Sequence, residues 1–137
     1  MKVDPRILYQ GLLARAVPHI HAMGILANMQ AESGFNPGIQ ETHPIAGRGG
    51  YGLAQWTGPR RRALERFAKA YGRPVSDWEV QLDYLLTEDD TDHYLDQRFE
   101  TIEDATLWFL HHWERPAKPN ESVRVAYVHH LANEVTA

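Results

Sequence analysis

One glutamate lies where a helix is expected to end, in surroundings that suit it to give up a proton. Residues 18–33 carry apolar side chains around nearly the whole helix circumference, which is typical of a buried helix. Gly34 and then Pro37 predict that this helix stops just after Glu32. Burial and the negative end of the helix dipole both disfavour the charged form of a carboxyl group. Glu32 is therefore a candidate general acid. The alternative is a surface glutamate in the last helical turn, and this pattern alone fits both.

A second stretch follows, punctuated by glycine and rich in side chains that can bind a ligand. It reads Gly50-Tyr51-Gly52-Leu53-Ala54-Gln55-Trp56. We expect it to return polar and aromatic groups to the neighbourhood of Glu32, as the second wall of one cleft. Tyr51 and Trp56 each have a flat apolar ring with a polar end, which suits a ligand face but also suits core packing.

Length and composition set the class of protein. A chain of 137 residues, 43% hydrophobic and 23% charged, predicts one globular domain over residues 1–137. The net charge of −4 argues against a nucleic-acid partner. The chain has no cysteine, which rules out disulfides, thiolate metal sites and a cysteine nucleophile. No apolar run is long enough to span a bilayer, and the first residues do not resemble a signal peptide.

Eight histidines raise the question of a metal site. Adjacent pairs and i, i+2 pairs on a helix point apart, and no His-Glu-x-x-His motif is present. We therefore expect no metal and no cofactor.

The elements that must position these residues are mainly helical. Apolar periodicity and capping signals predict five or six helices with little strand. One is expected to be capped by Ser76 with Glu79 as its capping-box partner, and another by Thr101 with Asp104. The acidic run Glu88–Asp92 is expected to be a break. The other helices are expected at residues 5–16, 18–33, 59–70 and 121–134, with a long glycine-rich loop or small hairpin between the second and the third.

The two stretches together resemble the phage tail lysozyme family, within the lysozyme-like superfamily that includes goose-type lysozymes and lytic transglycosylases. The resemblance rests on Ala31-Glu32-Ser33-Gly34-Phe35-Asn36-Pro37 and Gly52-Leu53-Ala54-Gln55-Trp56, in this order. Gln81-Leu82-Asp83-Tyr84-Leu85 and Trp113-Glu114-Arg115-Pro116 are also similar to the family pattern, so the likeness runs from about Met23 to Ala126. It implies a lysozyme-like fold.

The resemblance also implies a chemistry. The expected enzyme cleaves the β-1,4 bond between N-acetylmuramic acid and N-acetylglucosamine in bacterial peptidoglycan, with Glu32 as general acid. Ser33 and Gln55 match polar groups beside the acid, and Tyr51 and Trp56 are expected to contact sugar rings. Two departures stand out. Ala54 replaces the methionine that transglycosylases favour, and Ala126-Tyr127-Val128 only partly matches their last motif.

A second carboxylate would decide the mechanism. A hydrolase usually pairs its acid with another carboxylate, and Glu41 is the acidic residue of the predicted loop. The alternatives are a solvated Glu41 beside a lytic transglycosylase, which needs Glu32 alone, or a glycan-binding tail module without activity. Glu114 and Arg115 are expected to form a structural ion pair. We expect a monomer, free or built into a phage virion, that reaches the cell wall by phage delivery or through a holin.

Overall fold

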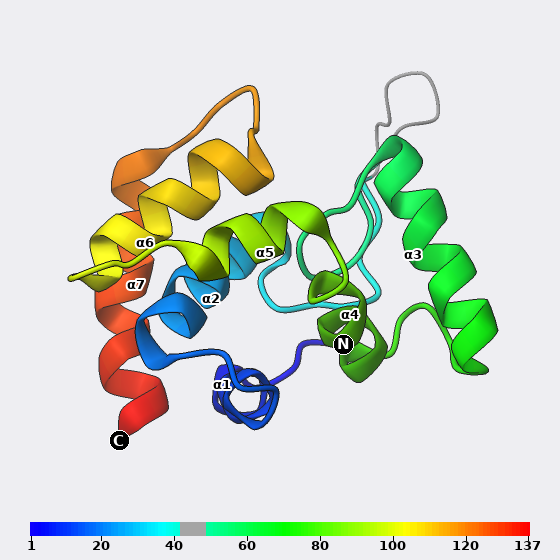
Figure 1. Ribbon diagram of the computed structural model, residues 1–137, viewed down its shortest axis with the longest axis horizontal. Coiled ribbons are helices and arrows are strands. Elements are labelled where there is room, and N and C mark those ends of the chain that lie inside the picture. Colours follow the sequence, from blue (N-terminus) through cyan, green and yellow to red (C-terminus); the bar gives the residue numbers. More distant parts are fainter. Residues whose placement is uncertain (42–48) are drawn as a thin grey trace.

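The computed structural model describes residues 1–41 and 49–137, and helices make up most of them. The elements are α1 (Pro5–Ala14), α2 (His19–Ser33), α3 (Gly58–Tyr71), α4 (Trp78–Leu85), α5 (Asp89–Asp96), α6 (Ile102–Phe109), the π-helix η1 (Leu110–Glu114) and α7 (Glu121–Thr136). Within these residues there is no extended strand, only isolated bridges from Tyr51 to Gln40 and to Trp56. The mainly α class is confirmed (Figure 1).

The expected count of five or six helices was too low, because the acidic run does not break the chain. Glu88 instead lies at the N-cap of α5, and Asp89, Asp90 and Asp92 form its first turn. The positive end of a helix dipole stabilises carboxylates at this place. The cap of α4 is also one residue later than expected. Asp77, not Ser76, accepts hydrogen bonds from the Glu79 and Val80 amides.

The expected Thr101 cap is confirmed. Its hydroxyl accepts a hydrogen bond of 3.1 Å from the amide of Asp104 at the start of α6. Here the local sequence signal and the local structure agree, because the bond joins groups only three residues apart.

Helix α2 runs through the interior of the molecule. It packs on α6, α7 and α1, and Figure 1 shows α6 and α7 along one side of it, with α3 on the opposite side of the molecule. Its middle turns are completely buried, as the apolar circumference predicts. Residues 51–56 form a short hairpin closed by the bridge from Tyr51 to Trp56. One contiguous core joins α2 to the hairpin residues Leu53, Ala54 and Trp56. No helix in the described ranges has both the length and the apolar character needed to cross a bilayer.

Helix α2 packs closely against α6 at Gly24. A Cβ atom added there would lie 2.5 Å from the Tyr94 hydroxyl and 2.9 Å from the backbone carbon of Ala105. Both separations are below van der Waals contact, and the α6 backbone would have to move.

We therefore expect Gly24→Ala to lower the free energy of unfolding by about 1–3 kcal/mol, the usual cost of overpacking. Urea denaturation monitored by circular dichroism measures it. Gly38→Ala is the matched control, because a Cβ there meets nothing closer than 3.7 Å. Equal stability of the two variants would show that α2 and α6 are less tightly packed than described.

Candidate active site

Glu32 lies in the last turn of α2, where the helix leaves the core. Its side chain is 16% exposed. Gly34 ends the helix with φ 59°, and its backbone N–H donates a hydrogen bond to the Gln30 carbonyl. Burial is the largest influence on this carboxyl and raises its pKa. Arg124 acts in the opposite direction, while the negative charge of Glu41 adds to the rise. The group is thus suited to hold a proton and then release it.

Arg124 of α7 is the partner of Glu32, and the sequence reasoning missed it. It is only 3% exposed. Its Nη2 lies 3.5 Å from Glu32 Oε1, Nη1 donates to Asn28 Oδ1 at 2.8 Å, and Nε donates to the Pro119 carbonyl at 3.0 Å. An arginine on the same helical face as Val128 and Leu131 was the available signal, since a charge on an apolar stripe must find a buried partner.

Asn28 fixes this arginine in turn. Its amide nitrogen donates to the Gly24 carbonyl at 2.8 Å and the Thr106 carbonyl at 3.1 Å, so its oxygen faces Arg124. The guanidinium is therefore held by α2 directly and by α6 through Asn28. The carboxyl of Glu32 has a fixed cation beside it.

A tight hairpin of residues 51–56 is joined to the end of α2. The backbones of Tyr51 and Trp56 exchange two hydrogen bonds of 3.0 Å. Gln81 of α4 holds the turn: its oxygen accepts from the Leu53 amide at 2.9 Å, and its nitrogen donates to the Pro37 and Val75 carbonyls. Gly52 has φ 82°, and a Cβ there would lie 2.8 Å from the Gln81 oxygen, so glycine is needed.

Ser33 joins the two stretches that the sequence placed together. Its hydroxyl lies 2.7 Å from the Leu53 carbonyl and 3.0 Å from the Met29 carbonyl, and it accepts from the Phe35 amide at 3.2 Å. The residue is 6% exposed. Its hydrogen-bonding capacity is used inside the protein, so this geometry assigns Ser33 to the frame and not to a ligand.

Gln55 and Tyr51 lie at the accessible side of the hairpin. The Gln55 nitrogen donates to the Gly52 and Ile39 carbonyls, and its oxygen has no partner among the described residues. Tyr51 is half-buried, with the Arg61 guanidinium 5.1 Å from the centre of its ring. Burial raises the pKa of Tyr51, and Arg61 opposes the rise. Both residues remain available to a ligand.

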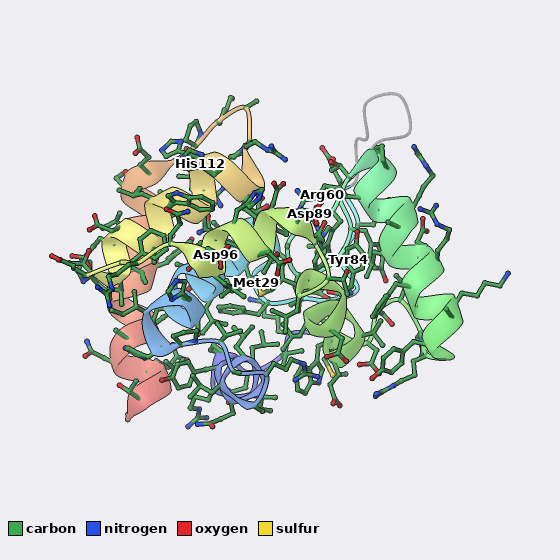
Figure 2. All side chains as sticks on the ribbon, viewed as in Figure 1. Met29, Arg60, Tyr84, Asp89, Asp96 and His112 are labelled. Atoms are coloured by element: carbon green, nitrogen blue, oxygen red, sulfur yellow. The ribbon has the colours of Figure 1, made fainter. Side chains whose placement is uncertain are left out.

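Trp56 does not fit the role expected of it. It is 1% exposed, and its indole nitrogen donates to Glu88 Oε1 at 2.9 Å. Tyr84 and Trp113 contact the ring edge to face. Figure 2 shows Tyr84 and Arg60 together with Asp89 where α3, α4 and α5 meet. Since no ring face is open, Trp56 packs the core, as the alternative interpretation had it.

Glu41 lies at the rim of the hairpin. It is exposed, and its Oε2 accepts a hydrogen bond of 3.1 Å from the Gly50 amide. Its amide donates to the Gly50 carbonyl at 2.9 Å. The first contact orients the side chain, and the negative charge of Glu41, the smallest of the influences on Glu32, raises the pKa of Glu32.

The expected ion pair between Glu114 and Arg115 is wrong. Arg115 has φ 48° and pairs instead with Asp90 at 3.0 Å. Glu114 is turned the other way, and its Oε2 is buried without a hydrogen-bond partner in the described structure. The Glu114 carboxyl and the Arg115 guanidinium therefore form no ion pair. Burial raises the pKa of Glu114 well above its usual value, and Glu32 raises it further.

His43 lies outside the described residues, and the other histidines are dispersed, with His21 buried and the rest exposed. Three of them lie near glutamates, as the separate pairs His111–Glu121, His129–Glu103 and His130–Glu134. Across residues 1–41 and 49–137 no three histidine, aspartate or glutamate side chains are gathered as a metal site would require.

Ser33→Ala should lower the free energy of unfolding by about 1–3 kcal/mol, because the buried Leu53 carbonyl loses its donor. Chemical denaturation measures the change, and Ser122→Ala, at an exposed position of α7, is the control. Unchanged stability would mean that the Ser33 hydroxyl is free to bind a ligand after all.

Two similarities to known proteins bear on this site. The family model of the phage tail lysozymes matches residues 6–134. Morphogenesis protein 1 of Bacillus phage B103 is 32% identical over 136 aligned residues, which cover 90% of this chain. The chain spans 37% of the length of that relative. Because the family match includes Glu32, the hairpin and Arg124, and extends over nearly the whole sequence, the chain belongs to the phage tail lysozyme family.

Proposed function

We propose that this chain is a lysozyme-like glycosidase that cleaves the β-1,4 bond between N-acetylmuramic acid and N-acetylglucosamine in bacterial peptidoglycan, with Glu32 as general acid. The observation that carries the proposal is the buried carboxyl of Glu32, with its raised pKa, next to the fixed guanidinium of Arg124. Membership of the phage tail lysozyme family supports peptidoglycan as the substrate and a lysozyme-like fold.

The reaction begins with a proton transfer. Glu32 gives its proton to the glycosidic oxygen, the bond from that oxygen to C1 of N-acetylmuramic acid breaks, and positive charge develops on the sugar ring. Glu32 is then a carboxylate, and the Arg124 guanidinium 3.5 Å away stabilises the charge it has gained. A water molecule adds its hydroxide to C1, and its proton returns to a carboxylate. The protein is then ready for another turnover.

The exposure of the other residues guides the roles that we propose for them. Glu41 is the proposed second carboxylate, because it is exposed and oriented by the Gly50 amide. The free oxygen of Gln55 and the ring of Tyr51 are proposed to contact the glycan. Ser33 and Trp56 are buried and stabilise the hairpin through contacts inside the protein. No step requires a metal or an organic cofactor.

A lytic transglycosylase is the second candidate. In that reaction the 6-hydroxyl of the same sugar attacks C1, and Glu32 alone serves as acid and then as base. The observation that favours it is the exposure of Glu41, since its charge is more hydrated and less effective than that of a buried carboxylate.

The place of action follows from the same family. The relative from Bacillus phage B103 is named a morphogenesis protein. We propose that this chain is a monomeric module carried by a phage virion, where it opens the host cell wall for the phage.

Glu32→Gln should reduce peptidoglycan cleavage by about 10²- to 10⁴-fold, because the amide cannot donate the proton that general acid catalysis requires. Release of soluble fragments from purified cell walls measures the rate, and circular dichroism checks the fold. Glu100→Gln, at an exposed position outside the site, controls for the lost charge and should retain full activity. Near-wild-type cleavage by Glu32→Gln would refute the assignment.

The products and Glu41 decide between the two mechanisms. For a hydrolase, mass spectrometry of digested peptidoglycan should show reducing muramic acid ends, and Glu41→Gln should lose most activity. An intermediate loss with hydrolytic products would make Glu41 an electrostatic stabiliser. Anhydro-muramic ends from the wild-type protein, with Glu41→Gln fully active, would establish the transglycosylase instead.

A further inference from the structure

We propose that Arg61 is a positioning residue of this site: it fixes the peptide group between Gly49 and Gly50, and that peptide group holds the carboxylate of Glu41. The inference rests on the proposed function, in which Glu41 is the second carboxylate. It concerns a residue of α3, which belongs neither to the segment around Glu32 nor to the hairpin.

Three consecutive arginines lie in the first turn of α3, and the fold gives each of them different surroundings. Successive side chains of a helix point in directions about 100° apart. Arg60 is turned toward the Glu88 carboxylate, and Arg62 is exposed. Arg61 has a side chain that is 21% exposed, and its guanidinium lies 5.1 Å from the centre of the Tyr51 ring. Packing therefore distinguishes Arg61 from its two neighbours.

The guanidinium of Arg61 contacts two separate segments of the chain. Its Nη1 donates to the Gly49 carbonyl at 3.0 Å, and its Nη2 donates to Gln40 Oε1 at 3.1 Å. Gln40 lies opposite Tyr51 in an isolated antiparallel bridge. The two nitrogens thus connect α3 to both sides of this bridge. Arginine suits such a pair of contacts because its donors form a rigid planar fork, which lysine lacks.

The contact with Gly49 controls the direction of the Gly50 amide. The Gly49 carbonyl and the Gly50 N–H belong to one planar peptide group, so they point in opposite directions. Arg61 holds the oxygen of this group, and the N–H donates to Glu41 Oε2 at 3.1 Å. Positive charge at the carbonyl also polarises the group, which makes its N–H a stronger donor. The position of Arg61 is thereby transmitted to the Glu41 carboxylate.

This peptide group depends on an outside contact because glycine lies on both sides of it. Glycine has access to more backbone conformations than any other residue, so sterics leave the orientation of the group open. A larger residue at position 50 would not solve the problem, since its Cβ would clash with the Gln55 side chain. Arg61 supplies the restraint that the local sequence lacks.

Loss of Arg61 should leave the local backbone pairing in place. The Glu41 amide still donates to the Gly50 carbonyl at 2.9 Å, and this bond does not involve the arginine. The peptide group before Gly50 would be free to turn, and the Glu41 carboxylate would then lose its fixed donor. The expected defect is therefore one of orientation in a folded protein.

Arg61→Met tests the role in catalysis, because methionine keeps an apolar stem beside Tyr51 and has no N–H donor in its side chain. We expect kcat on soluble peptidoglycan fragments to fall about 10- to 100-fold, the cost of a misplaced reacting group. In a Glu41→Gln background the same change should cost almost nothing more, because residues that act through one another are not additive. Arg62→Met is the matched control and should retain full activity.

Two kinetic outcomes would contradict the proposal. Equal losses from Arg61→Met in the wild-type and Glu41→Gln backgrounds would make Arg61 merely structural. Full activity of Arg61→Lys would show that a positive charge is sufficient and that the fork fixes nothing.

A second test does not depend on catalysis. Proton–nitrogen NMR follows the Gly50 amide, whose proton resonance depends on the acceptor that it meets. Glu41→Gln should shift this resonance in the wild-type protein, because a carboxylate acceptor is replaced by an amide. The same substitution should shift it far less in Arg61→Met, since the N–H no longer faces position 41. Equal shifts in the two backgrounds would overturn the proposal.

The two tests separate this inference from the proposed function. If Glu41→Gln cleaves peptidoglycan at the full rate, Glu41 is not the second carboxylate and the proposed hydrolytic mechanism fails. The resonance of the Gly50 amide then still decides whether Arg61 holds the Glu41 carboxylate.

Discussion

The buried guanidinium of Arg124 is the interaction on which the site depends. An unpaired cation inside a protein is strongly unfavourable, so α7 can pack on α2 only with this group satisfied. Asn28 supplies one acceptor and the Pro119 carbonyl another, while Glu32 provides the opposite charge. Because Asn28 is itself fixed by carbonyls of α2 and α6, three helices define where the arginine lies. The position of the Glu32 carboxyl follows from that of the arginine.

Two opposing influences then tune the carboxyl. Burial raises the pKa of Glu32, and the arginine lowers it, with burial the larger of the two. A stronger ion pair would leave a permanent carboxylate that could not donate a proton. An acid without the arginine would donate one, but its anion would have less to stabilise it. The contact of 3.5 Å between Arg124 and Glu32 serves both protonation states of the carboxyl, and the negative charge of Glu41 adds to the rise of its pKa.

The hairpin is held by its core residues Leu53, Ala54 and Trp56 and by buried hydrogen bonds to side chains outside it. Gln81 satisfies the Leu53 amide and two carbonyls, and Ser33 faces the Leu53 carbonyl. The Trp56 indole nitrogen donates to the Glu88 carboxylate, which also accepts from Arg60. The Arg60 guanidinium in turn lies over the Trp113 ring. These contacts connect the hairpin to η1 through Glu88 and Arg60.

The sequence by itself determined the mainly helical class, the end of α2 just after Glu32, the Thr101 cap and the family likeness, because each rests on periodicity or on contacts a few residues apart. It could not determine which polar side chains are turned inward. Arg124 and Glu32 are 92 positions apart, and Gln81 and Pro37 are 44 apart, so their pairing exists only after the helices pack. The acidic run that begins α5 was misjudged for a similar reason. Its charges are favourable only at a helix start, and local composition alone predicted a break. Trp56 and Ser33 were assigned to a ligand because their chemistry allows it, whereas packing gave each of them a partner inside the protein. Burial, which raises the pKa of Glu32, belongs to the whole fold and to no single segment.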